Sequence, residues 1–168
     1  MHKKSQKSQI AIIGLGNLLM SDEGIGIHAI RTLQDGCQDE GVVWIDGGTD
    51  PWAALWEARD CQHVIIIDAV EGNALPGTLY RCDIEEVESE TGGLSLHDTS
   101  LSQIVAFEGS VGNAFASVTV LGIEPDRLDF GIGLSQTCSK KLSELMRVVR
   151  CEIDRLKNDN KTQGVRPC

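Results

Sequence analysis

The sequence lacks an excess of basic residues, and this absence restricts its partners. Its 168 residues include 15 Lys and Arg against 25 Asp and Glu, which gives a formal net charge of -10. A chain of this charge repels phosphate backbones. We therefore expect no nucleic-acid partner.

Long apolar runs are also missing. The longest stretches without a charged residue, 10–21 and 109–123, are shorter than the ~18 apolar residues needed by a membrane-spanning helix. The N-terminal lysines are followed by a run that glycines interrupt rather than by the apolar segment of a signal peptide. We expect a cytoplasmic protein with no membrane partner.

The six cysteines form no CxxC pair, which is the spacing typical of structural zinc sites and redox sites. Free thiols are usual in the cytoplasm. Cys61 and Cys138 are minor candidates for thiolate nucleophiles, but neither lies in a recognisable motif. Inert core cysteines are the simpler interpretation.

Short β-branched runs alternate with segments of helical periodicity along most of the chain. This alternation predicts an α/β fold, a three-layer sandwich in which a mostly parallel, twisted five-stranded sheet has helices on both faces. We expect a flexible leader at 1–9, one domain at 10–157 and a flexible tail at 158–168. The predicted strands are 10–13, 42–45, 64–67, 78–82 and 118–123. The first is expected at the centre and the fourth near an edge, with antiparallel pairing as an option.

Three loops at the carboxyl ends of these strands carry polar side chains. Ser21 is the expected N-cap of the first helix, with Asp22 and Glu23 in its first turn. Asp46 and Asp68 are expected directly after the second and third strands. In parallel sheets the functional site lies beyond these ends.

Glu23, Asp68 and His97 together offer two carboxylates and an imidazole, a ligand set that suits a divalent transition ion with open positions. His97 is expected in the first turn of a helix that Ser95 or Asp98 caps, where the N-terminal field favours neutral imidazole. Each residue also has a simpler interpretation. Glu23 could support its helix, Asp68 could cap a loop, and His97 could be a surface histidine.

Two other site chemistries remain open. Asp46 and Asp68, if they follow neighbouring strands, could share a proton as an acid/base dyad. The Gly-rich loop at 14–19 could bind a nucleotide, but it lacks the third glycine of GxGxxG. In addition, Asp22 and Glu23 would repel a pyrophosphate there.

Six separated motifs resemble those of the hydrogenase maturation endopeptidases, in matching order from about residue 10 to about residue 156. They are GLGNLLMSDEGIG at 14–26, DGGT at 46–49, IIIDAV at 65–70, PGT at 76–78, SLHD at 95–98 and LGIEP at 121–125. Proteases of this family remove a C-terminal extension from the large-subunit precursor of nickel–iron hydrogenase once nickel has been inserted.

The resemblance implies roles for individual residues. Glu23, Asp68 and His97 would contact nickel that the precursor carries, a site that cadmium or zinc can also occupy, and would act in catalysis. Asp46, Gly47, Gly48 and Thr49 would receive the substrate or shape the site. The implied partner is the hydrogenase large-subunit precursor, and we expect a monomer without an organic cofactor. The alternative function is a non-catalytic nickel-binding or metal-delivery protein.

Overall fold

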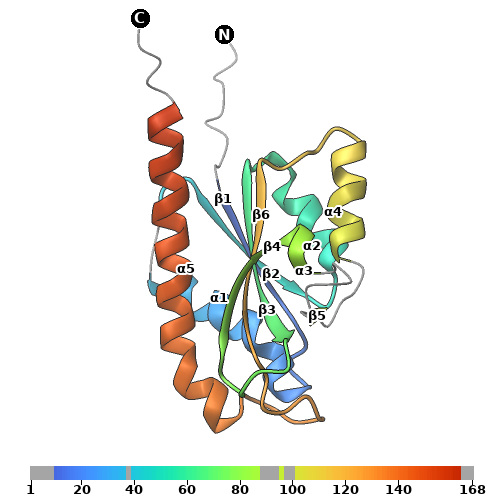
Figure 1. Cartoon of the computed structure of the whole chain (residues 1–168), viewed down its shortest axis with the longest axis vertical. Helices are drawn as coiled ribbons and strands as arrows, with labels where there is room; N and C mark the ends of the chain where they lie inside the picture. The colour runs from blue at the N-terminus through green and yellow to red at the C-terminus, as the bar shows by residue number, and fades with distance from the viewer. Residues whose placement is uncertain (1–9, 37–38, 88–94, 97–100, 164–168) are drawn as a thin grey trace, which may run out of the picture.

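The computed structural model describes residues 10–36, 39–87, 95–96 and 101–163, and in this part of the chain a single sheet lies between two helical layers (Figure 1). The strands are β1 (Ile10–Leu15), β2 (Val42–Gly48), β3 (His63–Glu71), β4 (Leu79–Asp83), β5 (Ser95–Leu96) and β6 (Ser117–Ile123). The α-helices are α1 (Ile25–Gly36), α2 (Pro51–Glu57), α3 (Ile84–Val87), α4 (Leu101–Ser110) and α5 (Gln136–Gln163). Two short 3-10 helices are η1 (Ser21–Gly24) and η2 (Ala58–Asp60).

The main sheet has the order β2-β1-β3-β6-β4, and the short β5 pairs with the end of β3. β2, β1, β3 and β6 are parallel, while β4 runs antiparallel to β6 at the edge. The predicted sandwich with a mostly parallel five-stranded sheet is confirmed, as is the antiparallel edge strand. The prediction that the first strand is central is wrong, because β3 occupies the middle and β1 lies between β3 and β2.

Each face of the sheet has its own apolar core. Along β3, Val64 and Ile66 pack on the face of α2 and α4, whereas Ile65 and Ile67 pack on the face of α1 and α5. Figure 1 shows these two helical layers on opposite sides of the sheet. The strand is covered on both faces, which explains its unbroken aliphatic run.

Strands β2 and β3 continue past their predicted ends. β2 includes the Asp46-Gly47-Gly48 segment that was expected to stop it, and β3 continues through Asp68 to Glu71. The extension of β3 has a structural cause, because Asp68 pairs with Gly122 of β6 and Val70 pairs with Leu96 of β5. Asp68 is therefore part of the strand and does not follow it.

Two helix caps expected from the sequence are not found. Ser21 is not an N-cap, because it lies inside η1 with a φ of 49°, and no side chain in the described part of the chain caps η1. Ser95 belongs to β5 and so caps no helix. Asp50, in contrast, does cap α2, since its side chain accepts a hydrogen bond from the Ala53 amide.

The last helix, α5, runs to Gln163, so residues 158–163 of the expected flexible tail are helical. None of the helices in the described residues is both long enough and apolar enough to cross a bilayer.

Candidate functional site

A pocket of about 180 Å³ opens where β1 leaves the sheet, beside β2 and β3. Four of its lining residues come from loops or helices that follow strands, and the others belong to the strands themselves. The lining residues are Leu15, Gly16, Glu23, Gly48, Thr49, Pro51 and Asp68. The pocket thus brings together two acids that are far apart in the sequence.

Glu23 reaches the pocket because η1 folds back tightly onto the end of β1. A Cβ atom at Gly16 would lie 1.7 Å from the Glu23 carbonyl oxygen, and Gly16 has a φ of 132°, so only glycine fits there. The Glu23 amide also donates to the Met20 carbonyl oxygen at 3.1 Å. Glu23 is half-buried, and its side chain lines the pocket from the η1 side.

Asp68 lines the same pocket from inside β3. It is only 2% exposed, and its Oδ1 accepts a hydrogen bond from the Ala69 amide at 2.8 Å. Helix α1 approaches closely just before it, since a Cβ at Gly26 would lie 2.2 Å from the Ile67 carbonyl oxygen. The close packing of α1 on β3 places the acid of η1 and the acid of β3 at one opening.

The four residues of the DGGT motif have separate positions. Gly48 and Thr49 line the pocket, and the Gly48 carbonyl oxygen accepts a hydrogen bond from the Gly16 amide at 2.8 Å. Gly47 allows close packing, because a Cβ there would lie 2.8 Å from the Leu15 side chain. Asp46 is not among the described residues that line the pocket. Its side chain forms an ion pair with Arg31 of α1 at 3.0 Å.

The possible Asp46 and Asp68 dyad is therefore wrong. Its premise was that the two acids follow neighbouring strands, but β1 lies between β2 and β3. Gly14 of β1 is paired with Asp46 on one side and with Ile67 on the other. With a strand between them and Asp46 bound to Arg31, the two carboxylates cannot share a proton.

His97 lies outside the described residues, as does Asp98, the second candidate for the cap of its helix. Within the described part of the chain, no cluster of three His, Cys, Asp or Glu side chains is arranged to hold a metal ion. The predicted meeting of Glu23, Asp68 and His97 therefore stays a prediction, with its two carboxylates placed at one pocket.

Asp22 has a position that the sequence did not indicate. It was expected in the first turn of the first helix, but its fully buried carboxylate accepts hydrogen bonds from a distant loop. The donors are the amides of Asp126 and Arg127 on Oδ2, both at 2.9 Å, and of Ser135 on Oδ1 at 2.7 Å. Burial alone would raise the pKa of Asp22, but these hydrogen bonds outweigh it and lower the pKa below its usual value.

The two candidate thiols have the environment of core cysteines. Burial raises the pKa of the Cys61 thiol, and it raises the pKa of Cys138 to about 11. Cys138 is completely buried and its Sγ lies 3.8 Å from the Glu124 carbonyl oxygen. Both side chains are therefore protonated at neutral pH, which does not suit a nucleophile.

Comparisons with known proteins agree on one family. Residues 27–152 match the family model described as hydrogenase maturation protease. The hydrogenase 2 maturation protease of Escherichia coli (strain K12) is 30% identical over 145 residues, which are 84% of this chain and 88% of that protein. The hydrogenase expression/formation protein HupD of Thiocapsa roseopersicina is 30% identical over 139 residues, 80% of this chain. This chain spans only 63% of the length of that HupD.

A solved structure shares the fold. The hydrogenase maturating endopeptidase HybD from E. coli superposes with a TM-score of 0.77 and 26% sequence identity, covering 88% of this chain and 93% of that chain.

Proposed function

This chain belongs to the hydrogenase maturation protease family, and we propose that it is an endopeptidase that processes a hydrogenase large-subunit precursor. It would remove the C-terminal extension after nickel insertion and recognise the nickel that the precursor carries. The E. coli relatives, which are named a maturation protease and a maturating endopeptidase, support this reaction class.

One observation carries the proposal: Glu23 and Asp68 line the same small pocket although they come from η1 and from β3. Carboxylates are suitable ligands for a divalent ion, and a substrate-held ion would bring its own remaining ligands. We propose His97 as the third contact. The pocket volume of about 180 Å³ is below the roughly 300 to 1,000 Å³ of sites for larger organic ligands, which favours a metal centre over a dinucleotide.

The roles of these side chains follow from their chemistry. The substrate-bound nickel would orient the scissile peptide beside Glu23 and Asp68 or polarise a water molecule near it. One of the two carboxylates would take a proton from the attacking water. Gly48 and Thr49 would hold the extended precursor segment at the pocket wall that they form. Asp46 and Gly47 would shape that wall from β2.

The test is a processing assay with purified precursor in nickel-loaded and nickel-free forms, read by mass spectrometry. We expect the loaded precursor to lose its C-terminal extension and the nickel-free precursor to keep its full mass. Exposed acids provide matched controls, Glu40→Gln for Glu23→Gln and Asp35→Asn for Asp68→Asn. The two pocket variants should fail to process, and the two controls should process like the wild-type chain.

The same assay distinguishes the endopeptidase from the alternative function. A nickel-binding or metal-delivery protein would bind or transfer nickel and leave the mass of the loaded precursor unchanged. An unchanged mass with the wild-type chain would therefore refute the endopeptidase.

A further inference from the structure

We propose that Asp22 is a positioning residue, whose carboxylate ties the loop at 124–135 to η1 and thereby holds the neighbouring Glu23 in the pocket. This inference rests on the proposed function, because it gives Asp22 its role through Glu23. It assigns to Asp22 no contact with substrate or nickel.

The carboxylate of Asp22 is enclosed by the loop that it holds. Both of its oxygens accept backbone hydrogen bonds, from Asp126, Arg127 and Ser135 at 2.7 to 2.9 Å. Its side chain is fully buried, so water cannot replace a lost donor. Backbone amides, unlike long side chains, cannot rotate away to another partner, and the position of Asp22 relative to the loop is therefore well defined.

Backbone contacts extend this connection around η1. The Asp22 amide donates to the Arg127 carbonyl oxygen at 3.0 Å, and the Ser21 amide donates to the Gly131 carbonyl oxygen at 2.9 Å. The Gly131 amide in turn donates to the Leu19 carbonyl oxygen at 2.9 Å. Ser21 has a φ of 49°, an unfavourable conformation for a non-glycine residue, which such contacts on both sides maintain.

The geometry of a 3-10 helix links this connection to Glu23. Successive side chains on such a helix point about 120° apart, because it has about three residues per turn. With the Asp22 side chain fixed toward the loop, the next side chain faces the pocket, and Glu23 does line it. Among the described residues no side chain caps η1, so its contacts with neighbouring segments, the loop and Gly16 among them, set the orientation of this turn.

The test compares Asp22→Asn with a control on α1, Asp35→Asn. Asp35 is exposed, so the control removes a charge of the same sign without touching η1 or the three amides. An asparagine at 22 would direct an NH2 group toward backbone N–H groups and loosen the loop. We expect the processing rate at saturating nickel-loaded precursor to fall at least tenfold in Asp22→Asn, since small misplacements of catalytic groups have such effects. The control should stay within twofold of wild type.

A double-mutant cycle distinguishes positioning from a general loss of structure. The rates of Asp22→Asn, Glu23→Asp and the combined variant are measured at a temperature where circular dichroism shows all three folded. If Asp22 acts through Glu23, the combined loss should be at least fivefold smaller than the product of the two single losses. A combined loss equal to that product, or an Asp22→Asn rate within twofold of wild type, would overturn the proposal.

A second variant serves if Asp22→Asn does not fold. Gly131→Val disturbs the adjoining contact between the same loop and η1, because a Cβ there would lie 2.7 Å from the Ser21 Oγ. It takes the place of Asp22→Asn in the same cycle, with the same criteria. Wild-type chain run in parallel keeps the two proposals apart: no cleavage by the wild type refutes the proposed function, whereas equal cleavage by wild type and variants refutes only the positioning role.

Discussion

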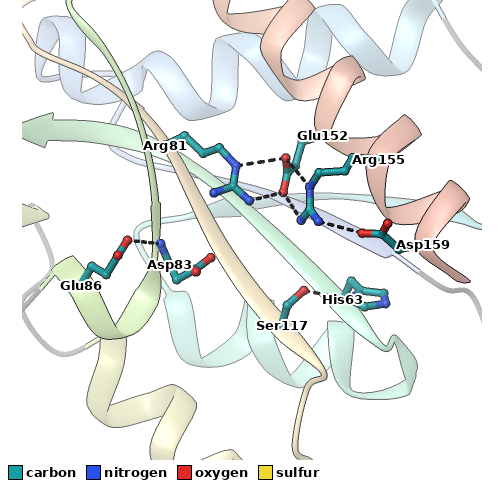
Figure 2. Close-up of polar contacts among 8 residues, drawn as sticks. All are labelled: His63, Arg81, Asp83, Glu86, Ser117, Glu152, Arg155 and Asp159. Carbon is teal, nitrogen blue, oxygen red and sulfur yellow. Dashed lines mark hydrogen bonds and ion pairs between the residues drawn. The ribbon is translucent and has the colours of Figure 1, made fainter. Parts of the chain in front are cut away.

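Two of the buried carboxylates, those of Asp22 and Glu152, are stabilised in different ways. Asp22, beside the pocket, receives three backbone amides. Glu152 of α5, which is 5% exposed, receives two guanidinium groups, those of Arg81 on β4 and Arg155 on α5. Figure 2 shows Arg81 and Arg155 approaching Glu152 from two elements, an arrangement that we call the edge-strand clamp.

The difference indicates what each region does. The edge-strand clamp neutralises its acid with charge from flexible side chains, which are 44% and 45% exposed and can adjust to small movements. It attaches the edge strand β4 to α5. The amides around Asp22 belong to the backbone and carry no net charge. They fix the position of the carboxylate relative to the loop. We therefore expect changes near the pocket to alter the reaction and changes in the clamp to alter stability.

The largest expected effect is the loss of processing when a pocket acid is neutralised. Asp68→Asn should lower the processing rate at least ~100-fold, because the proposed function uses this carboxylate for metal contact or proton transfer. Thermal unfolding followed by circular dichroism should show a folded protein. Glu152→Gln, the matching change in the clamp, should retain the wild-type rate below its melting temperature. An Asp68→Asn variant that processes at the wild-type rate would show that the pocket and the edge-strand clamp do not differ in their effect on the reaction.

A change in the edge-strand clamp should lower the free energy of unfolding rather than the processing rate. Glu152→Gln removes the acid between two guanidinium groups and should lower the free energy of unfolding by about 2 kcal/mol, less than the 3 to 5 kcal/mol for fully buried pairs because both arginines are partly exposed. Denaturant titration measures the change. Leu156→Met, a nearby volume-conserving core change on α5, is the control and should cost less than 1.5 kcal/mol.

The clamp also predicts how stability depends on pH. Burial raises the pKa of Glu152, but hydrogen bonds from Arg155 and Arg81 outweigh it and lower the pKa to about 2, from 4.5 in the unfolded chain. Because the folded pKa is the lower one, this stabilisation is complete above about pH 4.5 and is lost as the pH falls toward 2. The difference in unfolding free energy between wild type and Glu152→Gln should therefore shrink over this interval. A difference that stays constant from pH 6 to pH 2 would contradict the assignment.

The smallest effect is expected for the exposed ion pair of Asp46 and Arg31. Their side chains are 37% and 59% exposed, so Asp46→Asn should lower the free energy of unfolding by less than about 0.5 kcal/mol. Chemical denaturation of Asp46→Asn beside Glu152→Gln compares an exposed pair with a buried acid directly. A loss for Asp46→Asn as large as that for Glu152→Gln would show that burial does not explain the difference.

The fold could be predicted because its signals are local and repeated. The run from Val64 to Ile67 is apolar at every position, as a strand covered on both faces requires, and Asp50-Pro51 marks the start of α2. The positions of strand ends were predicted less accurately. Whether β3 stops at Asp68 or continues to Glu71 depends on pairing with β5 and β6, which no local pattern reports.

The candidate site was predicted in part. Glu23 and Asp68 were named together from residue type and position, and the structure places both at one pocket. The prediction that Asp46 and Asp68 could share a proton was wrong, because the sequence does not reveal the order of strands in the sheet. The hydrogen bonds of Asp22 were missed because its partners, Asp126, Arg127 and Ser135, follow it by more than a hundred residues.

By itself, the amino-acid sequence determined the type of fold, the family motifs and which acids stand near strand ends, because apolar periodicity and short motifs are properties of neighbouring residues. Only the tertiary structure decided that β1 separates Asp46 from Asp68, that Gly16 and Gly26 let η1 and α1 approach the sheet, and that Asp22 faces a distant loop. These features depend on which segments pack against one another. Local sequence allows several such arrangements, and close packing of the whole chain decides between them.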